Sequence, residues 1–438
     1  MKSAEWVGQQ LKVLPCLLHN QTFIAPTWAQ HSTPSLVIQQ YNLAFQNNID
    51  FVGLRYGGSG DYHITSKLHQ INNFGCNSSD FVGLEGEIAF IPSGSCTIFT
   101  KAFLAQGANA SAVIIYNTAQ GSLPGSRVLP SPWFEGDPLV TVPVFGVSFS
   151  VGNYLREISI NNSWEVLLRS NTTIYTTPTQ NLFCDTPGGD PNSTIILGAH
   201  LDSVEAGPGI NDNGSGSATV LELAIQWFAT GLTPKNRIRF AWWGAEEEGL
   251  LGSRNYLRYL EQHDQAEFNT IALGLNLDMV GSPNFIPMIG KYSSDPSVPT
   301  AARNGSNYIT KLFMDHYASI EAQHEFIEMT AGSDHYAFIE KGIPAGRIHS
   351  GAAQKKDIPL KRKYGGLINA IADTCYHQSC DDLQNFSSEI LDQIPVAMAS
   401  VLQTLANLEN LREKLREGAA IISTNAQDRI TFKDKHEF

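Results

Sequence analysis

Five residues have side chains that could bind metal ions: His200, Asp212, Glu247, Asp278 and His377. Imidazole and carboxylate ligands together suit zinc, and no thiolate is needed. Five protein ligands for two ions require one shared ligand and leave positions for water. Glu246 stands beside one ligand and is placed to act as a general base. These residue types therefore predict a site for two zinc ions that activates water.

Apolar stretches are expected to position three of these ligands. Residues 193–200, 237–244 and 271–277 read as buried strands. The first ends in His200, and the other two run into Glu247 and Asp278. Ligands of open α/β sheets bind outside the carboxyl ends of the strands, which favours a common site.

Loops are expected to carry the other two ligands. Asp212 lies in a Gly- and Asn-rich loop, 207–216, before an expected helix. His377 lies in a small loop between two cysteines that a disulfide could close. Asp202 is two residues after His200, on the same side of an extended chain. It can therefore accept a hydrogen bond from the imidazole nitrogen that does not bind metal.

A simpler interpretation exists for each residue alone. A lone histidine or aspartate is more often structural, and the three acids at 246–248 could form a solvated acidic turn. Five ligand types in these contexts are hard to obtain by accident, so we favour the metal site.

Four strings resemble the M28 family of zinc metallopeptidases, and secreted and vacuolar fungal leucine aminopeptidases in particular. The strings are Gly198–Ser203, Gly209–Gly216, Ala245–Ser253 and Tyr376–Gln378. The resemblance extends from about residue 55 to about residue 410.

The resemblance implies a role for each residue of the site. His200 and Asp278 would bind one zinc ion, Glu247 and His377 the other, and Asp212 would bridge both. Glu246 would be general base and acid, Tyr376 would donate to the oxyanion, and Asp202 would support His200. The implied enzyme is a di-zinc aminopeptidase that hydrolyses the N-terminal peptide bond of peptides, with apolar N-terminal residues such as Leu preferred.

Other functions on the same scaffold are a carboxypeptidase, a glutaminyl-cyclase-like enzyme and a non-catalytic receptor or binding protein. A carboxypeptidase should offer cations for the substrate carboxylate, and none stands out in the metal-site motifs. A cyclase needs one zinc ion, and a receptor needs no intact Glu246.

Several further residues carry weaker predictions. Ser333–His335 is expected to line the substrate pocket, although Gly332 stands where some relatives have Arg. His349 is expected to be structural. Asp381 and Asp382 are expected at the surface or behind the ligands.

Composition limits the partners. The net charge of −13 argues against nucleic acid as a partner. The sequence contains no apolar run of 18 or more residues, so we expect no membrane span. We expect peptide substrates with a free N-terminus and a monomeric chain.

Six cysteines, 16% charged residues and many glycosylation sequons point to a secreted protein, with a vacuolar location as the alternative. Residues 1–18 show no clear signal peptide. The nine sequons begin at Asn20, Asn77, Asn109, Asn161, Asn171, Asn192, Asn213, Asn304 and Asn385. Asn213 lies in the metal loop, so we do not expect a glycan there.

The predicted fold is α/β, with a mixed central β-sheet flanked by helices and an inserted β-rich α+β domain that resembles the protease-associated (PA) domain. Residues 1–54 would form an N-terminal segment that partly packs on the catalytic domain. Residues 55–169 would form the PA domain, whose role would be that of a lid or wall of the active-site cleft, or of a purely structural insert. Residues 170–416 would form the catalytic domain, which ends in one long helix from 387 that Pro395 would either kink or begin, and residues 417–438 would form a loose tail.

Overall fold

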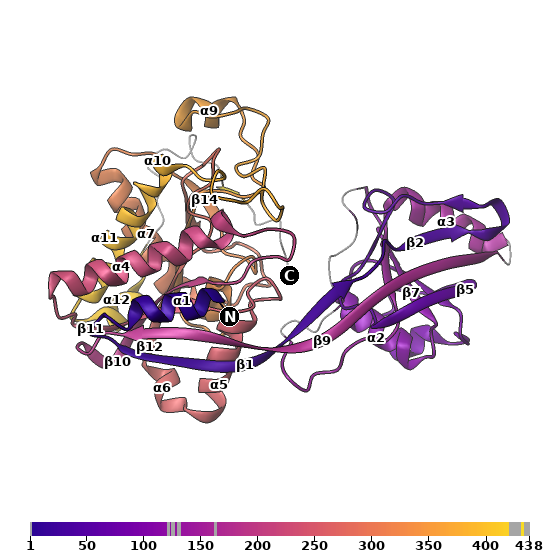
Figure 1. Cartoon of the computed structure of the whole chain (residues 1–438), viewed down its shortest axis with the longest axis horizontal. Helices are drawn as coiled ribbons and strands as arrows, with labels where there is room; N and C mark the ends of the chain where they lie inside the picture. The colour runs from indigo at the N-terminus through magenta and orange to yellow at the C-terminus, as the bar shows by residue number, and fades with distance from the viewer. Residues whose placement is uncertain are drawn as a thin grey trace. The chain divides into compact units, whose positions relative to one another are not determined.

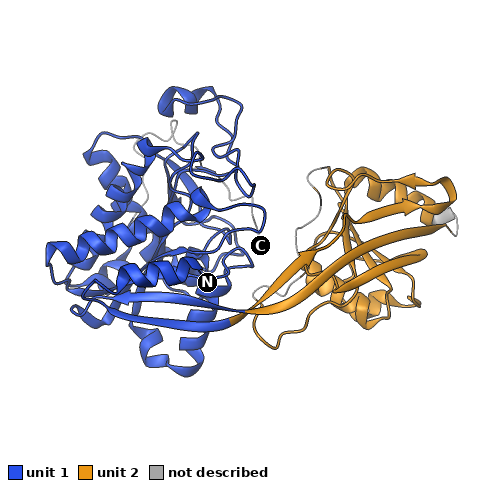
Figure 2. Cartoon of the chain, in the orientation of Figure 1, with its two compact units in different colours: residues 1–23, 178–437 blue, residues 24–177, 438 orange. Residues whose placement is uncertain are grey.

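The computed structural model describes residues 2–120, 123, 128, 133–161, 164–419 and 431–432, and the chain divides into two compact units (Figures 1 and 2). The larger unit contains residues 1–23 and 178–437, and the smaller unit residues 24–177 with residue 438. The divisions fall inside strands β1 (Leu17–Gln30) and β9 (Glu165–Asp185). They therefore differ from the expected boundaries at 54/55 and 169/170, because a continuous strand gives no composition change to read.

The larger unit is built on a mixed sheet with the strand order β16-β14-β13-β15-β12-β10-β11-β9. Its further strands are β10 (Asp190–His200), β11 (Asn236–Trp243), β12 (Ile271–Leu277), β13 (Met288–Lys291), β14 (Glu325–Glu328), β15 (Ala345–His349) and β16 (Thr431–Phe432). β10 pairs in parallel with β11 and β12, whereas β9 and β13 run antiparallel to β11 and β15. The predicted mixed α/β sheet is confirmed.

Helices cover both faces of this sheet. Ile195 and Leu197 of β10 pack in one core with α1 (Lys2–Leu11), α4 (Gly216–Thr230), α7 (Arg303–Ser319) and α11 (Ile394–Ala406). Ile196 points to the other face and packs with α5 (Leu251–His263) and α8 (His335–Glu340). A strand buried on both faces explains the uninterrupted apolar run of residues 195–197. The remaining helices are α6 (Gln265–Thr270), α9 (Ile358–Tyr364), α10 (Ser388–Leu391) and α12 (Leu411–Glu417).

The C-terminal helix predicted over 387–416 is broken into α10, α11 and α12. Pro395 stands in the first turn of α11, where its missing N–H is not needed, so it begins a helix, which is one of the two roles expected of it. The apolar stripe is core packing, as predicted, since Met398, Val401 and Leu402 are buried in the core with α4.

The tail predicted over 417–438 lies mostly outside the described residues. Thr431–Phe432 nevertheless pairs with β14, so this part is not loose.

The smaller unit has the strand order β9-β5-β6-β7-β8-β4, with β2 beside β9 and β3 beside β2. Its elements are β2 (Ser35–Ile38), β3 (Leu43–Ala44), β4 (Phe51–Gly53), β5 (Gly60–Gln70), β6 (Ile88–Pro92), α2 (Ile98–Gly107), β7 (Ala112–Tyr116), β8 (Val144–Val147) and α3 (Phe149–Asn161). Parallel strands β6, β7 and β8 have apolar residues on both faces, in two separate cores. This is the predicted β-rich α+β unit.

Candidate metal centre

Three neighbouring strands of the larger unit end at the site. His200 is the last residue of β10, and Asp278 follows the last residue of β12. Glu247 comes four residues after the end of β11. β10 lies between β11 and β12, so the three carboxyl ends meet at one edge of the sheet. The strand pairing thus brings these three ligands together as predicted from the sequence.

Two loops supply the remaining ligands. Asp212 lies in the turn Ile210–Ser215 between β10 and α4. The side chain of Asn213 donates to the carbonyl of Leu277 at 2.9 Å and accepts the N–H of Gly216 at 2.9 Å, which ties this turn to the end of β12. His377 lies in a loop closed by the Cys375–Cys380 disulfide.

These residues form two groups of three that share Asp212. The first donor set is His200, Asp212 and Asp278, and the second donor set is Asp212, Glu247 and His377. His200 Nε2 lies 3.3 Å from Asp212 Oδ1 and 3.5 Å from Asp278 Oδ1. His377 Nε2 lies 3.1 Å from Asp212 Oδ2 and 3.2 Å from Glu247 Oε2. Asp212 therefore offers one oxygen to each set.

Both sets fit a metal ion. Within each set the possible ligand atoms lie within 4.8 Å of one another, and all five residues except His377 are buried. Asp278 Oδ1 is buried without a hydrogen-bond partner among the described residues, which is costly unless a cation satisfies it. Two imidazoles and three carboxylates are a suitable donor set for zinc.

The electrostatics of the site also favour cations. Burial disfavours charge on His377, but Asp212 and Glu247 outweigh it and raise the pKa of His377 to about 10. Burial and the charge of Asp212 raise the pKa of Glu247 to about 7. Burial opposes charge on His200 too, yet Glu246 and Asp212 raise its pKa well above the ordinary value. The carboxylates thus attract protons to the imidazoles, and a metal ion would displace them.

Glu246 belongs to neither donor set and is buried at the same place, with 3% of its surface exposed. Burial raises its pKa well above the ordinary value; the positive charge of His200 opposes this, and the acids Asp334, Glu247 and Asp278 add to it. The preceding residue, Ala245, has a left-handed backbone with φ 56°. A carboxyl group with a raised pKa beside a metal site is a candidate proton carrier.

Asp202 lies where predicted but acts through different atoms. His200 Nδ1 donates to the main-chain carbonyl of Asp202 at 3.0 Å, and the Asp202 carboxylate lies 3.8 Å away. That carboxylate instead accepts the N–H groups of Glu246 and Glu247, each at 3.0 Å. It therefore holds the acidic loop after β11 in place, and the main chain orients the imidazole.

Tyr376 stacks on the ring of His377, with ring centres 3.9 Å apart. Burial and the surrounding carboxylates, Asp212 and Glu247 foremost, raise the pKa of Tyr376 well above 10. The phenol thus stays protonated and can donate a hydrogen bond.

Two of the residues with weaker predictions, His349 and Asp334, are buried. His349 is buried and donates from Nδ1 to the carbonyl of Asp278 at 2.7 Å, a structural contact as expected. Asp334 is buried, and it accepts a hydrogen bond from Ser253. Burial raises the pKa of Asp334 to about 7, although His200 opposes the rise.

Sequence reasoning missed a buried network behind the second donor set, made of Asp373, Asp381 and Asn385. Asp381 was expected at the surface or behind the ligands, and only 2% of it is exposed. Its place directly after Cys380 is the one signal that could have singled it out.

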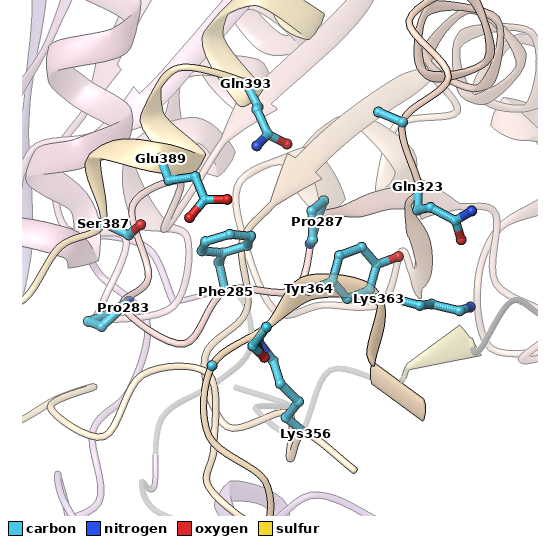
Figure 3. Close-up of a pocket in the computed structure, with 13 residues that line it drawn as sticks. Pro283, Phe285, Pro287, Gln323, Lys356, Lys363, Tyr364, Ser387, Glu389 and Gln393 are labelled. Atoms are coloured by element: carbon cyan, nitrogen blue, oxygen red, sulfur yellow. Dashed lines mark hydrogen bonds between the residues drawn. The ribbon is translucent and has the colours of Figure 1, made fainter. Parts of the chain in front are cut away.

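A separate hollow of about 530 Å³ is lined by residues of three segments, 283–287, 363–366 and 387–393, together with Ala322, Gln323 and Lys356 (Figure 3). Lys356 is buried there, and burial lowers its pKa to about 8. No residue of either donor set lines this hollow, so it is distinct from the metal centre.

Comparison with known proteins places both units. The sequence profile of Peptidase family M28 matches residues 181–402, and the profile of the PA domain matches residues 64–155. A probable leucine aminopeptidase 2 of Aspergillus fumigatus is 37% identical over 351 residues, which are 80% of this chain and 68% of that protein.

Solved structures show the same fold. An aminopeptidase from Aneurinibacillus sp. strain AM-1 superposes with a TM-score of 0.72 at 24% identity, covering 99% of this chain and 92% of that one. A zinc aminopeptidase from Bacillus subtilis gives a TM-score of 0.59 at 24% identity, covering 93% of this chain and 89% of the other.

Proposed function

Since this chain belongs to peptidase family M28, we propose that it is an aminopeptidase that uses two zinc ions to hydrolyse the N-terminal peptide bond of peptides. The family and the class of metallo-aminopeptidase agree with the prediction from the sequence. One observation supports the pair of ions above all others: the two donor sets share Asp212, and each faces one of its oxygens.

The two sets would divide the ions between them. The first donor set would hold one zinc ion and the second donor set the other, with Asp212 common to both. When bound, the ions would supply Lewis acidity to the peptide carbonyl and lower the pKa of a water at the site.

Glu246 would move the proton. Its carboxylate takes a proton from the attacking water and returns it to the leaving amine. Its raised pKa suits a group that must hold a proton near neutral pH. Its neighbour Glu247 faces His377 at 3.2 Å in the second donor set, so the adjacent pair divides the work between ligand and base.

Tyr376 would stabilise the oxyanion of the tetrahedral intermediate. Its phenol remains protonated and stacks beside a ligand, so its O–H can donate to charge that develops next to the second donor set.

The acidic character of the site would select peptides with a free N-terminus. Carboxylates that include Glu246 and Asp278 can bind the positively charged α-amino group, which an acylated peptide lacks. The name of the Aspergillus relative supports a preference for Leu or similar apolar N-terminal residues.

We propose a secreted or vacuolar location for a monomeric chain. All six cysteines are paired, as Cys16–Cys184, Cys76–Cys96 and Cys375–Cys380, which suits an oxidising compartment. Among the described helices, none has the length and apolar character that crossing a membrane would require.

The test is hydrolysis of leucine p-nitroanilide beside its N-acetylated form, with and without zinc. We expect zinc-dependent cleavage of the free-amine substrate alone. Glu246→Gln should slow this cleavage by about 10²- to 10⁴-fold, whereas Glu248→Gln, which removes the same charge two residues away, should keep it. If the zinc-bound protein cleaves neither substrate, the proposed aminopeptidase activity is refuted.

A further inference from the structure

Asp381 follows the disulfide loop of His377 and contacts the turn that carries Asp212. Its Oδ1 accepts the N–H of Asn211 at 2.8 Å, and its Oδ2 accepts the N–H of Asp212 at 3.0 Å. Its main-chain carbonyl accepts the N–H of Ile210 at 3.1 Å. One residue thus binds three consecutive N–H groups, the last of which belongs to the ligand shared by both donor sets.

A second acid, Asp373, binds the same turn from the other end of the loop. It accepts the side-chain amide of Asn211 at 2.7 Å and the N–H of Cys375 at 2.8 Å. Asn385 connects the two acids, because its Nδ2 lies 2.9 Å from Asp381 Oδ1 and 3.0 and 3.1 Å from the oxygens of Asp373. All three network residues are buried, so the loop is fixed to the turn at both of its ends.

Close packing reinforces this contact between loop and turn. A Cβ placed on Gly207 would lie 2.3 Å from the carbonyl oxygen of Gln378, the residue after His377. The two main chains therefore touch where a side chain has no room.

The two donor sets differ in what holds them. His200 and Asp278 of the first donor set lie at the ends of paired strands, so the sheet fixes their separation. His377 of the second donor set comes from a loop, has a left-handed backbone with φ 58°, and exposes 32% of its side chain. Its position relative to Asp212 depends on the contacts of the loop with the turn.

We propose that Asp381 is a positioning residue for the second donor set, and this inference rests on the proposed di-zinc function. Asp381 holds the loop of His377 against the turn of Asp212. Without it the second donor set binds its zinc ion weakly. The first donor set keeps its ion because the sheet still places His200 and Asp278, and the hydrogen bond from Asn213 to Leu277 still ties the turn of Asp212 to the end of β12.

The experiment is a zinc titration of the full chain in competition with a chromophoric chelator. The test variant is Asp381→Asn, which keeps the shape of the side chain and removes one of its two acceptor oxygens. The matched control is Asp382→Asn, since that neighbouring carboxylate accepts the N–H of Gln384 at 2.9 Å and does not bind the turn.

Wild type and control should each bind two zinc ions. In Asp381→Asn one ion should bind about 10- to 100-fold more weakly, the usual loss when a partner behind a ligand is removed. The affinity for the other ion should stay within about 3-fold.

A second background separates positioning from a general structural role. In Glu247→Gln the second donor set is already incomplete, so adding Asp381→Asn should change the affinity for the remaining ion by less than about 3-fold. If Asp381→Asn yields no folded protein, Asn385→Ala, which removes one donor to Asp381, should weaken the same ion by a smaller factor.

Two unchanged affinities in Asp381→Asn, or in Asn385→Ala where that variant replaces it, would overturn the inference and leave the proposed function intact. An equal loss of affinity for both ions would also overturn the inference and leave the proposed function intact. A wild-type chain that binds one zinc ion would overturn the proposed pair of ions, and the inference with it.

Discussion

Replacement of Gly207 by alanine should damage the metal centre without touching a ligand. The new Cβ would meet the carbonyl oxygen of Gln378 at 2.3 Å and its carbon at 3.0 Å. A carbon and a carbonyl oxygen ordinarily approach no closer than about 3.3 Å, so the two main chains must separate by about 1 Å. Main-chain atoms lie on both sides, so a rotamer change cannot relieve the clash.

This displacement falls between two ligands. Gln378 follows His377 directly, and Gly207 lies five residues before Asp212. A misplacement of about 1 Å at a reacting centre can cost about 100-fold in rate, which is the expected loss in kcat/KM. Overpacking of this kind costs about 1–3 kcal/mol in the free energy of unfolding, so the chain should still fold.

The assay measures kcat/KM for leucine p-nitroanilide at saturating zinc, beside the free energy of unfolding in urea. Gly8→Ala is the control, because a Cβ on Gly8 of α1 meets nothing within 4 Å. Gly207→Ala with a kcat/KM within about 3-fold of the control would show that the contact does not hold the ligands, and would refute this reasoning.

Three further outcomes are expected. Glu246→Gln should lower kcat by about 10²- to 10⁴-fold with the zinc content unchanged, and loss of zinc would point to a ligand instead of a base. Burial raises the pKa of Asp185, but hydrogen bonds from Arg239 and His19 outweigh it and lower this pKa from 3.8 to about 2, which corresponds to about 2 kcal/mol of stability. This contribution is present above about pH 4 and lost as the pH falls through about 2. The free energy of unfolding of zinc-free protein, measured in urea, should therefore differ less and less between wild type and Asp185→Asn over that interval. A difference that stays constant would contradict this prediction. Replacing both Cys16 and Cys184 by serine should lower the free energy of unfolding by about 2–5 kcal/mol, measured at a pH where both proteins refold, and an unchanged value would mean that the bond constrains nothing in the unfolded chain.

That these five residues come together could be predicted because each obeys a rule that is visible along the chain. His200 and Asp278 stand where apolar strands end, and parallel strands bring such ends to one edge of a sheet. Asp212 and His377 stand in loops marked by glycines and by cysteines. Residue type and local context were therefore sufficient, and no long-range contact had to be known.

The supporting contacts could not be predicted because they depend on the path of loops. Asp381 accepts a hydrogen bond from Asn211, which lies 170 positions away, and no periodicity in the sequence predicts that contact. Asp202 was expected to orient His200 through its carboxylate, but pattern cannot tell a side-chain oxygen from a main-chain one. The break of the C-terminal helix at Asn407–Asn410 follows no proline or glycine, so the apolar stripe continued across it.

The place of Asn385 has a consequence for how this protein is made. Its amide binds two buried acids, and 6% of the residue is exposed, yet Asn385-Phe386-Ser387 is a glycosylation sequon. A glycan attached to that nitrogen would take it out of the core and away from Asp381. The same amide nitrogen therefore cannot carry a glycan and also hold the two acids behind the second donor set. A host that glycosylates the unfolded chain at this position would produce protein whose second donor set is incomplete, and a host without that machinery would not.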